Sequence, residues 1–431
     1  MQRERQRTDV LVIGGGLAGL TAAAYVAKAG LSVDVLERSS ETGGRAATRC
    51  DDGFFLNRGA HALYRASDAV EVLAELGVEH HGRLVPSGGR ALRQGDLFQL
   101  PTGTLSLFTT GLLSLRAKAV AARWLERTPR LSPTTVEHLT VAEWLHDCPS
   151  EVRAVMEAFI RVSTYINAPE SFSAGTALLQ LQRALAGVYY VDGGWKTLVD
   201  GITARSTKWG ARISKGARAV RLESGNDEHV VTLADGTTLS ARAVVLAVPP
   251  DDAADLIATT GIAAPSAFNG AIRGRVAALD LALERLPRPE ERFVLGIDEP
   301  YYLSVHSAVA KVAPDGKAVI HVMKYLPPGE GDAVADRKEL EALLDLAQPG
   351  WRAEVVHEQY LPAITAVSRV DLAVEGGMRG RPAVDVPGLP GVTVAGDWVQ
   401  GGAWLADASF GSARAAARSV VGRLSPARAV A

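Results

Sequence analysis

The stretch Val10-Leu11-Val12-Ile13-Gly14-Gly15-Gly16-Leu17-Ala18-Gly19-Leu20 decides the fold of this chain. Its β-branched and leucine residues predict a buried strand, and residues 21–28 predict a helix. Three glycines at the G-x-G-x-x-G spacing separate the two. Gly14 permits a tight turn, Gly16 lets the backbone approach a diphosphate, and Gly19 lets the helix pack closely on the strand. The first N–H groups of that helix, at Leu17 and Ala18, then face the phosphates.

A second strand, 32–36, ends in Glu37. An acid placed roughly 20 residues past the last glycine holds the ribose hydroxyls of a dinucleotide. The order of strand, glycines, helix, strand and acid therefore predicts a Rossmann-type dinucleotide-binding unit.

The segment after Glu37 reads Arg38-Ser39-Ser40-Glu41-Thr42-Gly43-Gly44-Arg45-Ala46. Here the chain resembles the flavoprotein superfamily of amine oxidases, protoporphyrinogen oxidases and phytoene (carotenoid) desaturases, which places Gly-Gly-Arg after the ribose-binding acid. The resemblance implies FAD. We expect non-covalent binding, because the chain has no cysteine or histidine at the usual attachment site near the C-terminal helix. Arg45 can pair with a phosphate or order the loop, and a surface salt bridge is the alternative.

Further stretches extend the resemblance over most of the chain. Residues 190–198 match a glycine pair ahead of a helix, 220–250 match strands around the turn Asp235-Gly236, and 392–397 end in a Gly-Asp pair before a helix at 405–421. Motif and resemblance together indicate these cofactor-binding residues: Gly14, Gly16, Leu17, Ala18, Gly19, Glu37, Arg38, Gly43, Gly44, Arg45, Gly59, Ala60, His61, Val220, Gly396, Asp397, Leu405 and Ala406.

Composition excludes several classes of function. The formal net charge is −2 and 47% of the residues are hydrophobic, so no basic surplus points to nucleic acid. Cys50 and Cys148 form no metal-binding spacing, and we expect two free thiols and no metal. Residues 1–8 lack the apolar core of a signal peptide, and no apolar run is long enough to span a membrane. These features predict a cytoplasmic protein.

The nucleotide-binding signals fall in three blocks, so we expect an α/β fold with a discontinuous FAD-binding domain formed by 8–90, 188–255 and 385–422. Residues 91–187 and 256–384 then form an α+β substrate domain. Helical spacing marks 114–125, 141–146, 151–162 and 336–346, and alternation predicts strands at 272–283, 301–309 and 318–325. A sheet covered by helices is the expected architecture of the substrate domain.

Two residues are candidates for the chemistry. Trp404 precedes the C-terminal helix, where the resemblance implies an aromatic wall of the substrate site over the flavin; a packed core tryptophan is the alternative. His61 follows the glycine-rich strand 53–61 that the resemblance places under the flavin, and a structural histidine is its alternative. Tyr302 and His306 share one predicted strand face, as do His321, Met323 and Tyr325, so either set can line the cavity or pack in the sheet.

The chain also departs from the family pattern. Amine oxidases usually carry a lysine on the strand where this chain has Ala278, which weakens the amine-oxidase interpretation. Asp407 and Ser412 replace glycines of the family. Asp407 can cap the helix or lie close to the flavin pyrimidine, and the sequence does not choose between these.

The apolar stretch 105–115, followed by Arg116 and Lys118, has two interpretations. It suits a peripheral membrane contact of the kind that isoprenoid desaturases use, or a helix buried in the substrate domain.

We therefore expect an FAD-dependent oxidoreductase that removes a hydride from a C–H bond of an apolar, isoprenoid-like or polycyclic small molecule. A flavin amine oxidase is the alternative enzyme, and a redox-neutral flavin-dependent isomerase is a third hypothesis. The sequence names neither the substrate nor the electron acceptor nor the oligomeric state.

Overall fold

The glycine-rich stretch directly follows β1 (Gln6–Ile13), a central strand of a seven-stranded sheet. The structure is a computed structural model and describes residues 6–401 and 404–425. The sheet order is β10 (Arg212–Lys215), β2 (Val33–Glu37), β1 (Gln6–Ile13), β13 (Thr238–Leu246), β12 (His229–Leu233), β11 (Ala219–Ser224), with β19 (Val392–Val394) also on β13. β1 pairs in parallel with β2 and β13, and β12 is antiparallel to β13. Residues 10–13 of β1 are at most 4% exposed, as befits a strand with helices on both faces.

Helices pack on both faces of this first sheet. α1 (Leu17–Lys28) lies against α11 (Leu405–Leu424) on one face, where small alanines from both helices and valines of β1 and β2 form one core cluster. α9 (Pro250–Ala258) packs with leucines of β1, β2 and β13 on the other face. α8 (Lys196–Lys208) and α2 (Asp68–Glu75) complete this lobe by contacting α1 and α11 respectively.

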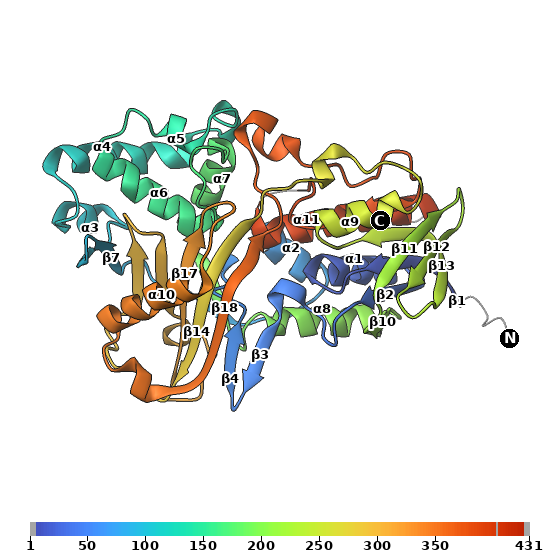
Figure 1. Cartoon of the computed structure of the whole chain (residues 1–431), viewed down its shortest axis with the longest axis horizontal. Helices are drawn as coiled ribbons and strands as arrows, with labels where there is room; N and C mark the ends of the chain where they lie inside the picture. Colours follow the sequence, from blue (N-terminus) through green and yellow to red (C-terminus); the bar gives the residue numbers. More distant parts are fainter. Residues whose placement is uncertain (1–5, 402–403, 426–431) are drawn as a thin grey trace.

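A second seven-stranded sheet forms the other lobe, which is the left half of Figure 1. Its order is β18 (Val355–Val367), β14 (Gly274–Leu283), β17 (Ala318–Leu326), β16 (Tyr301–Val305), β15 (Phe293–Gly296), β7 (Arg90–Arg93) and β8 (Asp96–Gln99). β14 lies antiparallel between β18 and β17, which explains why nearly all of its residues are buried. Leucines of α10 (Ala333–Ala347) cover one face of the sheet, and the opposite face points toward the first lobe.

Five helices cover the end of the second sheet, at the top left of Figure 1. They are α3 (Thr104–Thr109), α4 (Leu115–Arg127), α5 (Val141–Trp144), α6 (Ser150–Thr164) and α7 (Ala174–Leu185). Smaller sheets join the lobes: β3 (Thr48–Asp51) with β4 (Phe54–Asn57), and β9 (Val188–Val191) between β5 (Leu63–Tyr64) and β6 (Gly82–Leu84). The predicted α/β class, with one sheet of Rossmann type and a second sheet covered by helices, is confirmed.

One predicted element was too long. The strand expected over 301–309 ends at Val305, and His306–Ala308 forms a 3-10 turn. The turn takes His306 out of the ladder, so the alternating pattern does not continue past β16.

Among the described residues, no helix combines the length and apolar character needed to cross a bilayer. Cys50 is exposed, Cys148 is partly buried, and both are free thiols.

Candidate active site

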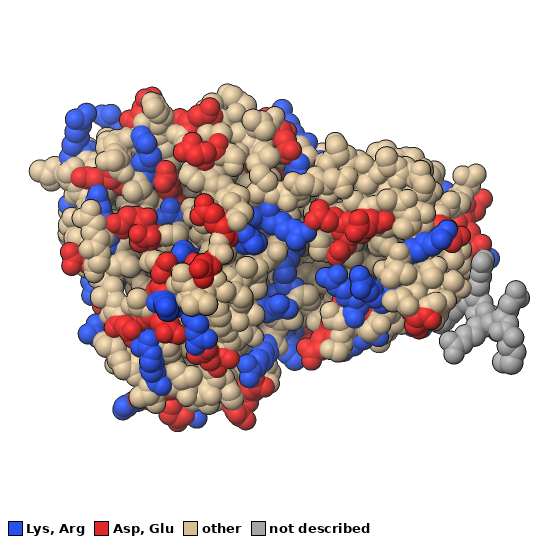
Figure 2. All heavy atoms as spheres, viewed as in Figure 1, with Lys and Arg blue, Asp and Glu red and all other residues tan. Residues whose placement is uncertain are grey.

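A cavity of about 1810 Å³ lies between the two lobes and runs from the glycine turn of β1 to the second sheet. Common ligand pockets measure roughly 300–1,000 Å³, so this one has room for a dinucleotide and a further small molecule. Lysine and arginine side chains gather along the hollow between the lobes in Figure 2. Arg38, Arg45, Arg58 and Arg218 are among the cavity-lining residues, which favours an anionic ligand.

The glycine turn has the shape of a diphosphate cradle. A Cβ added at Gly16 would meet nothing nearer than the Gly43 carbonyl oxygen at 4.0 Å, so Gly16 faces open space. The Gly43 N–H donates to the Gly15 carbonyl at 2.8 Å, which places the second glycine pair beside the first. Gly14 has φ +107°, a conformation that glycine adopts at low cost.

Two predicted residues lie behind the cavity wall and support it. A Cβ on Gly19 would lie 1.8 Å from the Gly14 carbonyl oxygen, so only glycine allows α1 to approach the turn this closely. Gly59 has φ +78°, and its N–H donates to Asp280 at 3.0 Å.

Glu37 ends β2 at the edge of the cradle. Its two carboxylate oxygens accept the backbone N–H groups of Gly15 and Ser39, each at 2.7 Å. These bonds fix the carboxylate at the cavity wall, where its remaining lone pairs can accept ribose hydroxyls.

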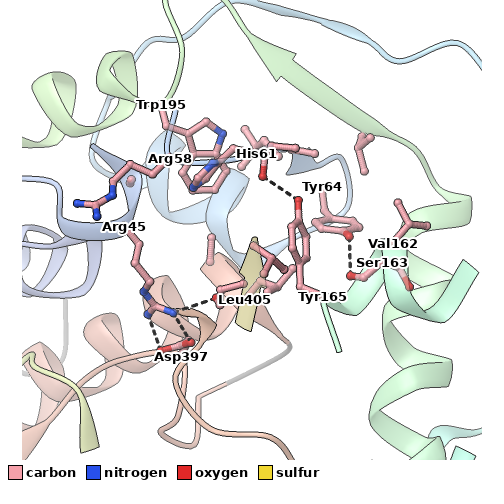
Figure 3. Close-up of a pocket in the computed structure, with 18 of the residues that line it drawn as sticks. Arg45, Arg58, His61, Tyr64, Val162, Ser163, Tyr165, Trp195, Asp397 and Leu405 are labelled. Carbon is pink, nitrogen blue, oxygen red and sulfur yellow. Dashed lines mark hydrogen bonds and ion pairs between the residues drawn. The ribbon is translucent and has the colours of Figure 1, made fainter. Parts of the chain in front are cut away.

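Arg45 joins the lobe's first and last segments. Its guanidinium donates to both oxygens of Asp397, at 2.7 and 2.6 Å, and to the Ala366 carbonyl at 3.0 Å (Figure 3). Burial would raise the pKa of Asp397, but Arg45 and the Ser368 N–H outweigh it and the pKa is lowered. The pair thus ties the loop that carries Arg45 to the segment after β19, with the Arg45 side chain 44% exposed and Asp397 buried.

Most of the predicted cofactor-binding residues line this single cavity. They are Gly14, Gly16, Leu17, Ala18, Glu37, Arg38, Gly43, Gly44, Arg45, Ala60, His61, Val220, Gly396, Asp397, Leu405 and Ala406.

Trp404 lies in the core and not on the cavity wall. Its side chain is 1% exposed, its ring packs 5.4 Å from the ring of Phe172, and its indole N–H donates to the Thr164 carbonyl at 2.9 Å. The expectation of an aromatic wall at this position is therefore corrected, because the indole fills a hydrophobic cluster between α11 and the helices of the second lobe.

His61 lines the cavity and packs against Trp195, with ring centroids 4.8 Å apart. Its Nδ1 lies 3.0 Å from the Gly59 carbonyl oxygen. A carbonyl can only accept, so Nδ1 carries the proton and Nε2 is left as an acceptor. Burial lowers the pKa of His61 to about 4, so the ring is neutral at physiological pH.

Aromatic residues form much of the inner wall, and sequence reasoning missed three of them, Tyr64, Tyr165 and Tyr190. The Tyr64 hydroxyl donates to the Ser163 carbonyl, and that of Tyr165 donates to the Ala60 carbonyl, each at 2.9 Å (Figure 3). The Tyr190 hydroxyl bonds to the hydroxyls of Tyr302 at 3.2 Å and Ser304 at 3.0 Å. These side chains come from separate elements, so no local pattern marked them as one set.

Some residues of the two predicted strand faces line the cavity, and the others lie behind its wall. Tyr302 and Met323 line the cavity. His306, His321 and Tyr325 are buried behind it, with at most 2% exposure. Ala278 sits opposite Met323 in the ladder between β14 and β17.

Asp407 lines the cavity but does not cap its own helix. It accepts the N–H of Ala69 in α2 at 3.2 Å and pairs with Arg183 at 2.8 Å. The N-terminus of α11 has no side-chain cap. Ser412 bonds instead to the backbone N–H of Gly396 at 2.9 Å, which ties α11 to the end of β19.

The comparisons with known proteins identify the family. The model of the family described as "Flavin containing amine oxidoreductase" matches residues 17–421. The chain belongs to this family. Membership confirms the expected superfamily, a family of flavin-containing oxidoreductases, and the open glycine cradle and lining arginines fit a dinucleotide diphosphate.

Curated relatives of the chain include both desaturases and an amine oxidase. A carotenoid 3,4-desaturase of Haloarcula japonica is 26% identical, with 79% of this chain and 80% of the relative covered. A putrescine oxidase of Kocuria rosea is 28% identical over 56% of this chain and 57% of that protein. A 15-cis-phytoene desaturase of an Oncidium hybrid cultivar is 26% identical over 58% of this chain. The match covers 48% of the length of this desaturase, so the chain spans about half of that relative.

Solved structures share the fold over nearly the whole chain. A wild-type putrescine oxidase bound to putrescine superposes with a TM-score of 0.71 at 17% identity, covering 97% of this chain and 99% of the other. Cyclohexylamine oxidase from Brevibacterium oxydans IH-35A gives 0.70 at 16% identity, covering 97% and 99%. At this identity the likeness establishes the fold alone.

Proposed function

We propose that this protein oxidises an apolar small molecule by removing a hydride from a C–H bond, with FAD as the acceptor. When bound, FAD supplies a two-electron acceptor for that hydride. In this proposal, the residues from Gly14 to Arg45 hold the diphosphate and ribose end of FAD. The rest of the cavity, bounded by the inner wall formed with the second lobe, would then take the substrate.

The inner wall carries the proposal, because the hydroxyls of its tyrosines are already hydrogen-bonded. The hydroxyls of Tyr64 and Tyr165 donate to backbone carbonyls, and the hydroxyls of Tyr190 and Tyr302 bond within a cluster. What remains facing the cavity is ring surface, together with apolar side chains such as Met323. Such a surface favours an apolar ligand, since a polar one would lose its water without gaining partners.

The acidic residues of the cavity also favour an uncharged, apolar substrate. Asp397 and Asp407 each pair with an arginine, as does Glu291 with Arg90 at 2.9 Å. Among the described lining residues, each buried carboxylate thus already has a donor, including Glu37 with its two N–H groups. A substrate ammonium would find no free buried carboxylate here, which disfavours cationic polyamines.

His61 is the proposed proton acceptor on this wall. Forming a double bond from two adjacent C–H groups removes one hydrogen as a hydride, which FAD would accept when bound, and the other as a proton. The neutral imidazole has Nε2 free to take that proton, while the two electrons of the second C–H bond form the new π bond. If the substrate loses hydrogen from a C–N unit instead, the same base is available.

We also propose that an exposed apolar surface beside the cavity contacts lipid. The α3–α4 patch, defined as Leu105, Phe108, Leu115 and Arg116, has three large apolar side chains 77%, 63% and 86% exposed. Ser106 of α3 and Leu125 of α4 line the cavity, so the patch adjoins its mouth. An apolar surface next to a cation suits binding to the surface of an anionic bilayer. Bound there, the protein would take up apolar substrate from the lipid through the adjoining cavity mouth.

Anaerobic flavin bleaching tests the proposal. Purified holoprotein is mixed without oxygen with a series of cyclic and linear isoprenoids and, in parallel, with putrescine, cyclohexylamine and benzylamine. We expect bleaching by an isoprenoid and a product two hydrogens lighter. Bleaching by amines alone would replace the proposal with amine oxidation, and a product of unchanged mass formed only by pre-reduced protein would indicate an isomerase.

A further inference from the structure

We propose that Asp280 and His321, a buried pair behind the cavity wall, are positioning residues that hold His61 as a proton acceptor. The inference rests on the role proposed for His61 and adds two residues that do not line the cavity. Asp280 lies on β14 directly opposite His321 on β17. The next pair along the same face of the ladder is Ala278 with Met323, and Met323 lines the cavity.

A continuous chain of hydrogen bonds leads from the pair to His61. His321 Nδ1 lies 2.6 Å from one oxygen of Asp280. The other oxygen accepts the N–H of Gly59 at 3.0 Å, and the Gly59 carbonyl accepts Nδ1–H of His61 at 3.0 Å. Both backbone polar groups of Gly59 are therefore committed, one to the carboxylate and one to the ring.

Burying a carboxylate costs free energy unless hydrogen bonds or an opposite charge compensate it. Asp280 and His321 are both 0% exposed. The donors to Asp280 among the described residues are His321, Gly59 and Gln359, so no lysine or arginine balances the charge. A buried carboxylate without a compensating cation is strongly unfavourable, and the hydrogen bonds from His321, Gly59 and Gln359 are its compensation.

Gly59 transmits the position of Asp280 to His61. Its φ of +78° restricts the site to glycine, and a Cβ there would meet Ile364 at 3.2 Å and Met323 at 3.4 Å. With its N–H anchored on a β-strand, the turn presents its carbonyl at a fixed place. The carbonyl then selects the Nδ1–H tautomer and leaves Nε2 as the acceptor.

Asp280, unlike His321, also acts on His61 in the direction that favours its protonated form. Asp280 and His321 act on His61 from the second sheet, His306 from the turn after β16, and Arg45 from the opposite lobe. Burial lowers the pKa of His61, and His321 and Arg45 lower it further, while the Gly59 carbonyl and the Asp280 carboxylate raise it. Burial and the neighbouring histidines hold the pKa of His306 well below its ordinary value, so that ring stays neutral. Asp280 is thus the anion that favours the imidazolium formed on proton uptake.

Variants at Asp280 separate geometry from charge. Asp280→Asn keeps an oxygen for the Gly59 N–H but removes the charge, whereas Asp280→Ala removes both. His321→Gln removes the imidazole and keeps a donor. Gln359→Leu is the matched control, because it deletes another donor to the same carboxylate oxygen without touching the bonds between Asp280, Gly59 and His61.

The measurement is an NMR titration of FAD-loaded protein labelled with ¹⁵N-histidine, in which His61→Asn assigns the His61 signals. We expect wild type and Gln359→Leu to show His61 protonated at Nδ1. Asp280→Asn should keep this tautomer but lower the pKa of His61, and Asp280→Ala should lose the tautomer preference. Substrate-dependent flavin reduction should slow roughly tenfold in Asp280→Asn, with its acid limb moved to lower pH.

An unchanged His61 tautomer and titration in both Asp280→Asn and His321→Gln would overturn the positioning role, even if Asp280→Ala does not fold. Failure of the proposed function looks different. In that case no isoprenoid bleaches the flavin, while the NMR shifts caused by the Asp280 variants persist.

Discussion

Arg45 and Asp397 stand 352 residues apart in the chain, yet the guanidinium of Arg45 donates to both carboxylate oxygens of Asp397. The pair connects the loop after β2 to the segment after β19, and both residues line the cavity. It therefore joins the two ends of the discontinuous nucleotide-binding lobe at the place where the cofactor would lie.

Replacing Arg45 tests this link. Arg45→Met should cost about 2 kcal/mol of unfolding free energy, because Asp397 is 2% exposed and loses its bidentate partner. Arg45→Lys should recover part of the loss, since an ammonium cannot form two parallel bonds. Because the pKa of Asp397 is lowered in the folded state, its contribution is present above the unfolded pKa of about 3.9 and disappears on acidification. Urea unfolding should show the wild-type advantage shrinking below about pH 4, and an advantage constant with pH would contradict this account.

The glycines of the turn should respond differently to added side chains. Gly16→Val places methyl groups in the open cradle, so we expect FAD affinity to fall by more than tenfold, above ~1.4 kcal/mol, with apoprotein stability unchanged. Gly19→Ala should instead destabilise the fold, because its Cβ would overlap the Gly14 carbonyl. Flavin titration and thermal melting of both variants check the contrast, and full flavin occupancy in Gly16→Val would show that the cradle does not hold the diphosphate.

Trp404 should matter for stability. Trp404→Ala removes a fully buried ring, and we expect a loss of roughly 3–5 kcal/mol. Trp404→Phe keeps most of the apolar volume but leaves the Thr164 carbonyl without its donor, at a cost of about 1–2 kcal/mol. Denaturant unfolding and reductive flavin kinetics are measured on the same samples. A selective loss of flavin reduction with unchanged stability would restore the wall role to Trp404.

Asp407 should make stability depend on pH in mild acid. Burial raises its pKa to about 6, against Arg183 and the Ala69 N–H, which lower it. Between about pH 3.9, the pKa of an unfolded aspartate, and about pH 6, the folded state holds an extra proton on Asp407. The contribution of Asp407 to the unfolding free energy therefore falls as pH rises across that window, by about 3 kcal/mol. Asp407→Asn should remove this component. Denaturation midpoints of both proteins are compared at several pH values, and parallel curves would refute the raised pKa.

The α3–α4 patch should govern lipid binding. Replacing Phe108 and Leu115 together with serine removes exposed apolar surface, so co-sedimentation with anionic phosphatidylserine vesicles should drop several-fold. The matched control is Val374→Ser, which removes an 89% exposed apolar side chain elsewhere. Flavin content and melting temperature should stay at the wild-type level in all variants. Equal sedimentation of wild type and the double variant would exclude the patch.

Local sequence determined the nucleotide-binding half of this protein. Strand, glycine turn and helix occupy consecutive residues. Gly14 and Gly19 are needed for close contacts with the adjacent strand and within the turn, and Gly16 leaves the cradle open. For this reason the cradle and Glu37 could be predicted from the sequence. His61 could be nominated too, because it follows a glycine-rich strand.

Only the tertiary structure decided the rest of the site. The inner wall collects Tyr64, Tyr165, Tyr190 and Tyr302 from separate elements, and a cavity formed by such distant segments has no periodic signal in the sequence. Trp404 shows the converse, since its position before a helix suits either a cavity wall or the core. Its ring packs against Phe172, and its indole N–H donates to the Thr164 carbonyl, so Trp404 lies in the core. A buried indole N–H needs an acceptor, and the Thr164 carbonyl supplies it.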